Sequence, residues 1–110
     1  MDWINLTQQH QIEKMDLNSF ENISLCFKHS TRCSISSMAL NRIESEWNNC
    51  NAIPYYLDLL SYRNLSNIIA EKYDVVHESP QVLLIKNGNC INHLSHNFIS
   101  MNQINKYING

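Results

Sequence analysis

Cys33 is the residue of this 110-residue chain whose type and position best suit chemistry. It follows an alternating segment at 23–29 that is typical of a strand, and it stands where a helical pattern begins. A cysteine at a helix N-terminus faces unpaired backbone N–H groups and the positive end of the helix dipole. The neighbouring Arg32 adds a positive charge, and both effects favour the thiolate, which is the form that attacks disulfides. The sequence therefore predicts a nucleophile for thiol-disulfide exchange, with a chemically inert helix-cap residue as the alternative.

Ser36 lies three residues after Cys33, and in a helix this spacing returns it to the same face. Its hydroxyl can donate a hydrogen bond to the thiolate, but it cannot form an internal disulfide. Cys33-Ser34-Ile35-Ser36 is therefore a monothiol version of the Cys-x-x-Cys redox pattern. We predict that Cys33 and Ser36 are the catalytic residues.

Three further cysteines are present, and none forms a Cys-x-x-Cys pair. Cys26 and Cys90 lie in predicted strands, and we expect Cys90 to be buried or half-buried, as free cysteines usually are. Cys50 follows a polar stretch and is expected to be exposed. It could resolve a disulfide with Cys33, although an exposed lone cysteine more often has no redox role.

No metal site is predicted. Cys26, His29 and Cys33 superficially resemble a ligand set, since Zn²⁺ binds Cys and His. Strand alternation, however, points Cys26 and His29 to opposite faces. His29 and His96 could instead tune the charge near Cys33, or be ordinary hydrogen-bonded residues.

The elements that must position these residues follow from apolar periodicity and turn signals. Pro54 restricts its strand to a strand start or a sheet edge, and Asn87-Gly88 favours a tight hairpin turn. The expected order is a short strand at 2–6, a helix from the Thr7 cap to about Phe20, a strand at 23–29, a helix from about Cys33 to 47, a strand at 53–60, a helix at 65–73, a hairpin of 82–85 and 91–94, and a helix after Ser100. Strands that alternate with helices pair in parallel, and the hairpin adds an antiparallel edge. The sequence thus predicts one α/β domain over 1–110 with a thioredoxin-like layout, a central mixed sheet of four to five strands flanked by helices.

Composition narrows the partners and the compartment. The formal charge of -2 provides no electrostatic footprint for nucleic acid or for an anionic membrane. The first residues lack the basic and apolar regions of a signal peptide, and the longest aliphatic run, at 82–85, is far too short to cross a bilayer. We therefore expect a cytoplasmic protein with free thiols, because a reducing cytosol disfavours disulfides.

Several blocks of residues resemble one known family. They are Lys28 to Ser36, Arg63, Ser66-Asn67, Ala70-Glu71, His77 to Gln81, and Ser95-His96. In order and spacing, from about Ile23 to Ile104, they are similar to the YtxJ family of monothiol bacilliredoxins. The resemblance implies a thioredoxin-like fold and a role in redox homeostasis and the stress response. It also implies that S-bacillithiolated proteins are the substrates, that bacillithiol or another low-molecular-weight thiol is the co-substrate without a further cofactor, and that Cys33 is the nucleophile.

The family's pattern also assigns substrate contacts, with one departure. The family typically has proline after the cysteine, whereas this chain has Ser34, so the rigidity of the first helical turn differs. The resemblance implies a cis peptide bond before Pro80, beside the cysteine, with the backbone of Ser79 free to pair with an extended substrate. From sequence alone a trans bond at the start of a strand would be the expectation. The predicted substrate-binding residues are Arg32, Ser34, Ser79 and Pro80.

Two rival functions remain open at this stage. A monothiol thioredoxin-like site can hold an iron–sulfur cluster between two subunits, with one cysteine from each. A non-catalytic stress or interaction module that keeps the fold is the other rival, and Ser34 makes it plausible. Visible absorbance after anaerobic purification would identify the first rival, and an assay of mixed-disulfide reduction would identify the second.

Overall fold

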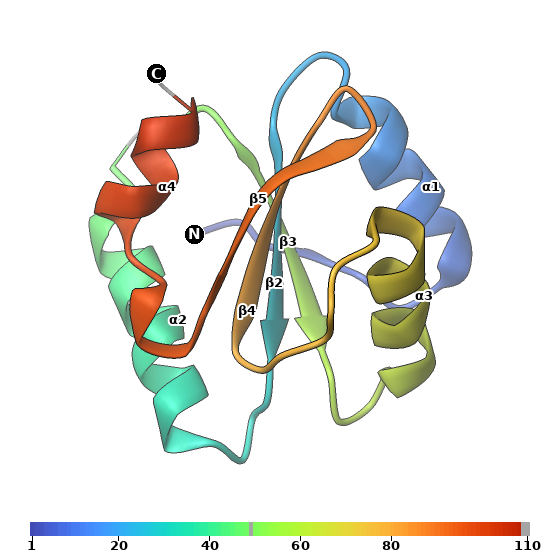
Figure 1. Ribbon diagram of the computed structural model, residues 1–110. Coiled ribbons are helices and arrows are strands. Elements are labelled where there is room, and N and C mark those ends of the chain that lie inside the picture. Colours follow the sequence, from blue (N-terminus) through green and yellow to red (C-terminus); the bar gives the residue numbers. More distant parts are fainter. Residues whose placement is uncertain (49, 109–110) are drawn as a thin grey trace.

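The computed structural model describes residues 1–48 and 50–108, which form one five-stranded sheet with helices on both sides (Figure 1). The elements in chain order are β1 (Ile4–Asn5), α1 (Gln9–Asn18), β2 (Ser24–His29), α2 (Ser34–Glu46), β3 (Ile53–Asp58), α3 (Arg63–Tyr73), β4 (Gln81–Lys86), β5 (Asn89–Ser95), a 3-10 turn η1 (His96–Phe98) and α4 (Met101–Ile108). This order confirms the predicted α/β layout. Within the described residues, none of the helices has the length and apolar character needed to span a membrane.

The sheet has the strand order β1-β3-β2-β4-β5. β1, β3 and β2 run parallel to one another, whereas β4 pairs antiparallel with β2 and β5 antiparallel with β4. The hairpin turn falls at Asn87 and Gly88, whose φ angles of 52° and 77° are those that a tight turn between antiparallel strands requires. The mixed sheet and the hairpin are therefore confirmed.

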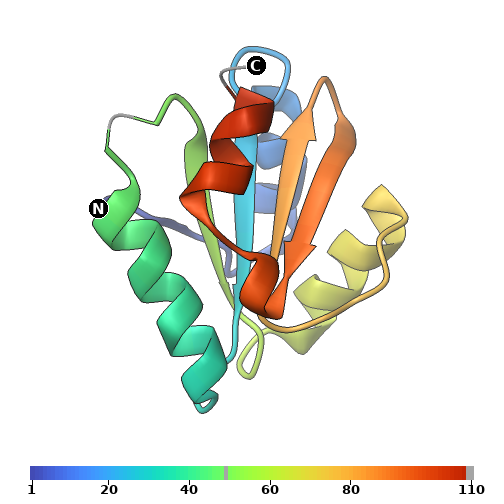
Figure 2. The same ribbon diagram turned by 60° about the vertical axis from the view of Figure 1, so that its left-hand side comes forward.

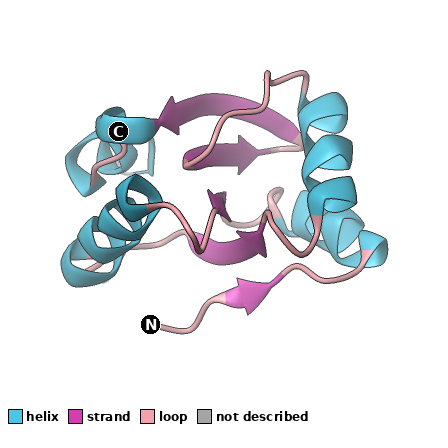
Figure 3. Ribbon diagram, turned by 90° about the horizontal axis from the view of Figure 1, so that it is seen from below, coloured by secondary structure: helices cyan, strands magenta, loops and turns pink. Residues whose placement is uncertain are grey.

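The helices cover the two faces of the sheet in pairs, α1 with α3 and α2 with α4 (Figures 1 and 3). All six residues of β2 are buried, as expected for a strand covered on both faces. Its side chains alternate: Cys26 packs in the cluster with α1 and α3, while Leu25 and Phe27 pack in the cluster with α2 and α4. The predicted alternation is confirmed, and β2 forms the centre of the core.

Pro54 occupies one of the two positions that the sequence allowed. It lies at the start of β3, as predicted, and β3 is an interior strand between β1 and β2. The N–H of Ile53 bonds the carbonyl of Ile23 on the β2 side, so the next position faces β1, whose pairing begins only at Tyr55. Proline is tolerated there because no neighbouring strand would accept a hydrogen bond from an N–H at this position.

The first helix also begins later than predicted. Gln8, not Thr7, is the N-cap, and the helix ends at Asn18 instead of Phe20. The side-chain oxygen of Gln11 accepts the backbone N–H groups of Thr7 and Gln8, at 2.7 and 2.9 Å. Gln11 therefore satisfies the N–H groups of the N-cap residue and of the residue before it, which is the role of the third helical residue in a capping box. At the other end of the chain, Ser100 caps α4 through the N–H of Gln103, at 3.2 Å, as predicted.

Candidate active site

Cys33 lies where β2 passes into α2, at the end of the molecule to which the parallel strands point (Figure 1). It is the N-cap residue of α2, with an extended backbone at φ -107° and ψ 122°. Its N–H donates to the carbonyl of Ser30 at 3.1 Å, and its own carbonyl accepts from Ser37 at 3.0 Å. The thiol is half-buried. The predicted placement at a helix N-terminus is therefore confirmed, and Figure 2 shows α2 running away from this end.

Ser36 is completely buried, and its hydroxyl contacts His29 and Ser30. It accepts the N–H of Ser30 at 3.0 Å, and it lies 2.6 Å from Nδ1 of His29. When Nδ1 is the acceptor, the hydroxyl proton points to His29. When Nδ1 carries a proton and donates it, the hydroxyl proton is free to turn toward another acceptor. The predicted donation from Ser36 to Cys33 therefore depends on the tautomer of His29.

His29 sits in an aromatic environment on the α2 side of the sheet. Its ring stacks on Phe27 with centroids 5.6 Å apart, and Tyr56 lies at the same centroid distance. Burial lowers the pKa of His29, while the negative charges of Asp58 and Glu44 partly oppose that shift. The imidazole is consequently neutral at pH 7, so it acts as a hydrogen-bond partner of Ser36 and contributes no positive charge to the site.

Ser79 and Pro80 directly precede β4, whose first residue pairs with Lys28 near the end of β2 that leads to Cys33 (Figure 1). Their peptide bond is cis, which confirms the expectation from the family resemblance. The carbonyl of Pro80 accepts the N–H of His96 at 3.0 Å. Among the described residues, the backbone of Ser79 makes no hydrogen bond, and its buried hydroxyl has no partner. Its N–H and carbonyl are thus available for a substrate strand.

A hollow of about 400 Å³ opens beside the turn that joins β2 to α2. It is lined by Thr31, Arg32, Asp58, Leu60 and Ser61. The carboxylate of Asp58 is held in place because it accepts the N–H of Leu60 at 3.1 Å and the hydroxyl of Ser61 at 3.0 Å. A guanidinium, a fixed carboxylate and hydroxyl groups therefore surround a space beside the turn that precedes Cys33, and such a space suits a small polar molecule. Ser34 is exposed at the first position of α2.

Burial raises the pKa values of the other three cysteines, and Cys50 is also too far from Cys33 to form a disulfide with it. Burial raises the pKa of Cys26 to about 12, and it also raises the pKa of Cys90, which is half-buried as predicted. Cys50 was predicted to be exposed, but it is half-buried against the α2 and α4 cluster, and burial raises its pKa. It follows the C-terminal end of α2, a 13-residue helix about 20 Å long, whereas a disulfide needs Cα atoms within about 7 Å. Cys50 therefore cannot resolve a disulfide with Cys33 in this fold.

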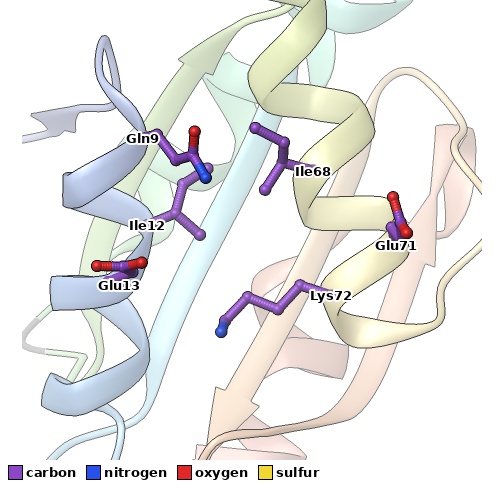
Figure 4. A pocket seen from close by; sticks show the side chains of 6 residues that line it. All are labelled: Gln9, Ile12, Glu13, Ile68, Glu71 and Lys72. Atoms are coloured by element: carbon purple, nitrogen blue, oxygen red, sulfur yellow. The ribbon is translucent and has the colours of Figure 1, made fainter.

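A second hollow, of about 410 Å³, lies between α1 and α3 (Figure 4). Its floor is Ile12 and Ile68, and its rim carries Gln9, Glu13, Glu71 and Lys72. It contains no thiol or imidazole, so we do not place the chemistry there. Across residues 1–48 and 50–108, no group of three or more His, Cys, Asp or Glu side chains is arranged to hold a metal ion.

The sequence missed two polar contacts at this end of the molecule. The bond between His29 and Ser36 joins a strand to a helix, and spacing alone did not reveal it. Lys28 contacts Ser66 and His77, and the sequence identified neither partner. The only feature of the sequence that could have indicated these contacts was a lysine inside a strand that is otherwise mostly apolar.

Comparisons with known proteins agree with this geometry. The family model described as "Monothiol bacilliredoxin BrxC" matches residues 4–104. A solved structure of a thioredoxin-fold protein named as a candidate oxidoreductase is 31% identical, with a TM-score of 0.82, and the match covers 94% of this chain and 90% of that one. Thioredoxin from Trypanosoma brucei brucei has a TM-score of 0.75 at 12% identity, with 99% of this chain and 93% of that one covered. Thioredoxin from Fasciola hepatica has a TM-score of 0.73 at 15% identity, with 96% of each chain covered. The two thioredoxins establish the fold alone.

Proposed function

This chain belongs to the monothiol bacilliredoxin family, and we propose that it reduces mixed disulfides between protein cysteines and bacillithiol through the Cys33 thiolate. The observation that carries the proposal is the placement of one half-buried thiol at the N-terminus of α2, with a serine instead of a second cysteine at the next turn. We propose that it acts as one domain in the cytoplasm. Bacillithiol or another small thiol is its co-substrate, and no further cofactor takes part.

The proposed first step is an exchange at sulfur. The Cys33 thiolate attacks the bacillithiol sulfur of the mixed disulfide and forms a new S–S bond. The bond between bacillithiol and the protein cysteine breaks, and that cysteine leaves as a thiolate, which takes up a proton from solvent. The protein substrate is reduced, while Cys33 carries the bacillithiol.

A second exchange regenerates the enzyme. An external low-molecular-weight thiolate attacks the bacillithiol sulfur of the Cys33 adduct, and Cys33 leaves as a thiolate. The product is a disulfide between the two small thiols. Because Cys50 is too distant and Ser36 has no sulfur, this thiol must come from outside the chain.

Two surfaces beside Cys33 fit the two halves of such a substrate. The unpaired backbone of Ser79 suits an extended peptide segment, which would pair with it as an added strand. The hollow with Arg32 and Asp58 suits the polar body of a small thiol, since it presents a positive charge, a negative charge and hydroxyl groups. Both assignments are part of the proposal.

A reduction assay with a bacillithiolated protein tests this function. The wild type is expected to release the reduced protein when bacillithiol is supplied, whereas Cys33→Ser is expected to be inactive, because a serine hydroxyl is not ionised at neutral pH. Cys50→Ser is the matched control, since it removes a thiol at the far end of α2. Failure of the wild type on the bacillithiol adduct, with activity on an adduct of another small thiol, would change the proposed co-substrate.

A further inference from the structure

Lys28 is fully buried in the central strand, which is unusual for a lysine. Its Nζ donates to the carbonyl of Ser66 at 3.2 Å and lies 3.4 Å from Nδ1 of His77. Neither partner is a carboxylate. Burial of an amine without an opposite charge is costly, and an apolar residue of similar length would fill the same space without that cost. Packing alone therefore does not explain the amine.

The amine links three separate segments at the active-site end. Lys28 belongs to β2, Ser66 belongs to the first turns of α3, and His77 belongs to the stretch that connects α3 to β4. The Ser66 hydroxyl also lies 3.1 Å from Nδ1 of His77. In Figure 1 the connecting stretch descends beside α3 to the start of β4. It has no regular secondary structure, so these side chains hold it where the strands do not.

Gln81 provides a second hydrogen bond to the stretch between α3 and β4. It is the register partner of Lys28 across β2 and β4, so both side chains lie on the same face of the sheet. Its side-chain N–H donates to the carbonyl of Val76 at 3.0 Å. The connection between α3 and β4 is thus held at Val76 by Gln81 and at His77 by Lys28 and Ser66. Two residues later it reaches Ser79, whose backbone is free.

The chemistry of the contacts defines the state of His77. The ammonium of Lys28 can only donate, whereas the Ser66 hydroxyl can donate or accept. Nδ1 is therefore the acceptor and the ring is neutral. Burial and the positive charges of Lys28 and Arg63 lower the pKa of His77, while Glu78 opposes that shift.

We propose that Lys28 and His77 are positioning residues that hold the connection between α3 and β4 so that the backbone of Ser79 is presented to the peptide part of the substrate. The inference rests on the proposed function, since it assumes that a protein disulfide is the substrate of Cys33. Neither residue is assigned contact with the substrate. Their effect is confined to binding of the polypeptide and does not extend to the reactivity of the thiol.

Lys28→Met in the full chain separates positioning from core packing. We expect KM for a bacillithiolated protein to rise on the order of tenfold, because a buried hydrogen bond to the connection is lost, with a smaller change in kcat. The reaction of Cys33 with a small aromatic disulfide, which has no peptide backbone, is expected to keep its wild-type rate. The thermal midpoint is expected to stay the same or rise, because the desolvated amine has been removed.

Hydrogen exchange provides a readout that does not need turnover. The backbone amide of Val75, which donates to the carbonyl of Ala70, is expected to exchange faster in Lys28→Met than in the wild type, while those of β2 and β3 keep their protection. Lys86→Met is the matched control, since it removes an exposed lysine at the opposite end of β4. His77→Phe is expected to behave like Lys28→Met, and His77→Gln, which keeps an acceptor, is expected to restore much of the protection.

The outcomes distinguish the two proposals. Wild-type KM and wild-type exchange in both Lys28→Met and His77→Phe would overturn the positioning role. An equal loss of rate toward the small aromatic disulfide would also overturn it, because Lys28 would then act on the thiol itself. If the wild type reduced no mixed disulfide, the proposed function would fail, yet faster exchange of the Val75 amide in Lys28→Met would still show that Lys28 holds the stretch between α3 and β4.

Discussion

The hydroxyl oxygen of Ser36 lies 2.6 Å from Nδ1 of His29, in a position closed to solvent. A dithiol enzyme would carry its second sulfur at this place, one turn after the nucleophile. Here the side chain is bonded inward to the sheet, and it also accepts the N–H of Ser30. Ser36 therefore connects the first turn of α2 to the end of β2, in addition to any role it has toward the thiolate.

Ser36→Ala is expected to lower the free energy of unfolding by about 1–3 kcal/mol, because it leaves the Ser30 N–H and the His29 ring without their buried partner. Chemical denaturation measures this change. Ser37→Ala, one position further along α2, is the control and is expected to change the stability by less than about 0.5 kcal/mol. Equal stabilities of the two variants would show that the buried contact contributes nothing.

Cys33 is expected to be the first of the four thiols to react with an alkylating reagent at neutral pH. Burial raises the pKa values of Cys26, Cys50 and Cys90, so those thiols stay protonated. Cys33 instead sits at the N-terminus of α2, directly after Arg32. Mass spectrometry of the labelled peptides at short times tests the order. Labelling of Cys50 or Cys90 at the same rate would contradict it.

The monothiol mechanism predicts that the wild type accumulates as a Cys33–bacillithiol adduct when no external thiol is present. The adduct persists because Cys50 lies beyond the far end of α2. Intact-mass measurement after one turnover with a bacillithiolated protein should show the added mass of one bacillithiol. An internal disulfide between Cys33 and Cys50, with bacillithiol released, would falsify the monothiol mechanism.

Ser34→Pro is expected to fold and to keep its activity. Position 34 is the first residue of α2, where proline needs no N–H partner and its fixed φ suits the helix. Cys33 already has the extended backbone that a residue before proline adopts. A thermal midpoint equal to or above that of the wild type, together with an unchanged reduction rate, is the expected result. A clear loss of either would mean that this turn differs from that of its relatives.

Stability is expected to fall as the pH drops from about 7 to 5, because burial lowers the pKa values of His29 and His77. The unfolded chain takes up protons at these residues near pH 6.5, before the folded protein does, so protonation favours unfolding in that window. Denaturation at several pH values measures the slope. His77→Gln removes one of the two groups and should flatten it. A free energy of unfolding that stays constant over this range would contradict the assignment of neutral, buried rings.

The sequence alone determined the features that depend on near neighbours along the chain. The alternation in β2 placed Cys26 and Phe27 on opposite faces, and Asn87-Gly88 located the hairpin turn. The break after His29 placed Cys33 at the start of a helix. These features are local because side-chain direction in a strand or helix repeats over two to four residues, and a turn depends on the dihedral angles of two.

The tertiary structure decided every contact that joins distant segments. Lys28 bonds Ser66 and lies next to His77, which are 38 and 49 positions away, and no periodicity relates them. The half-burial of Cys50 and the interior position of Pro54 likewise depend on which elements pack beside them. Periodicity states which face of an element is apolar, but the docking of one element on another selects the side chains that meet. The position of Cys33 at the start of a helix could therefore be predicted from the sequence, whereas the polar contacts around it were set only by packing.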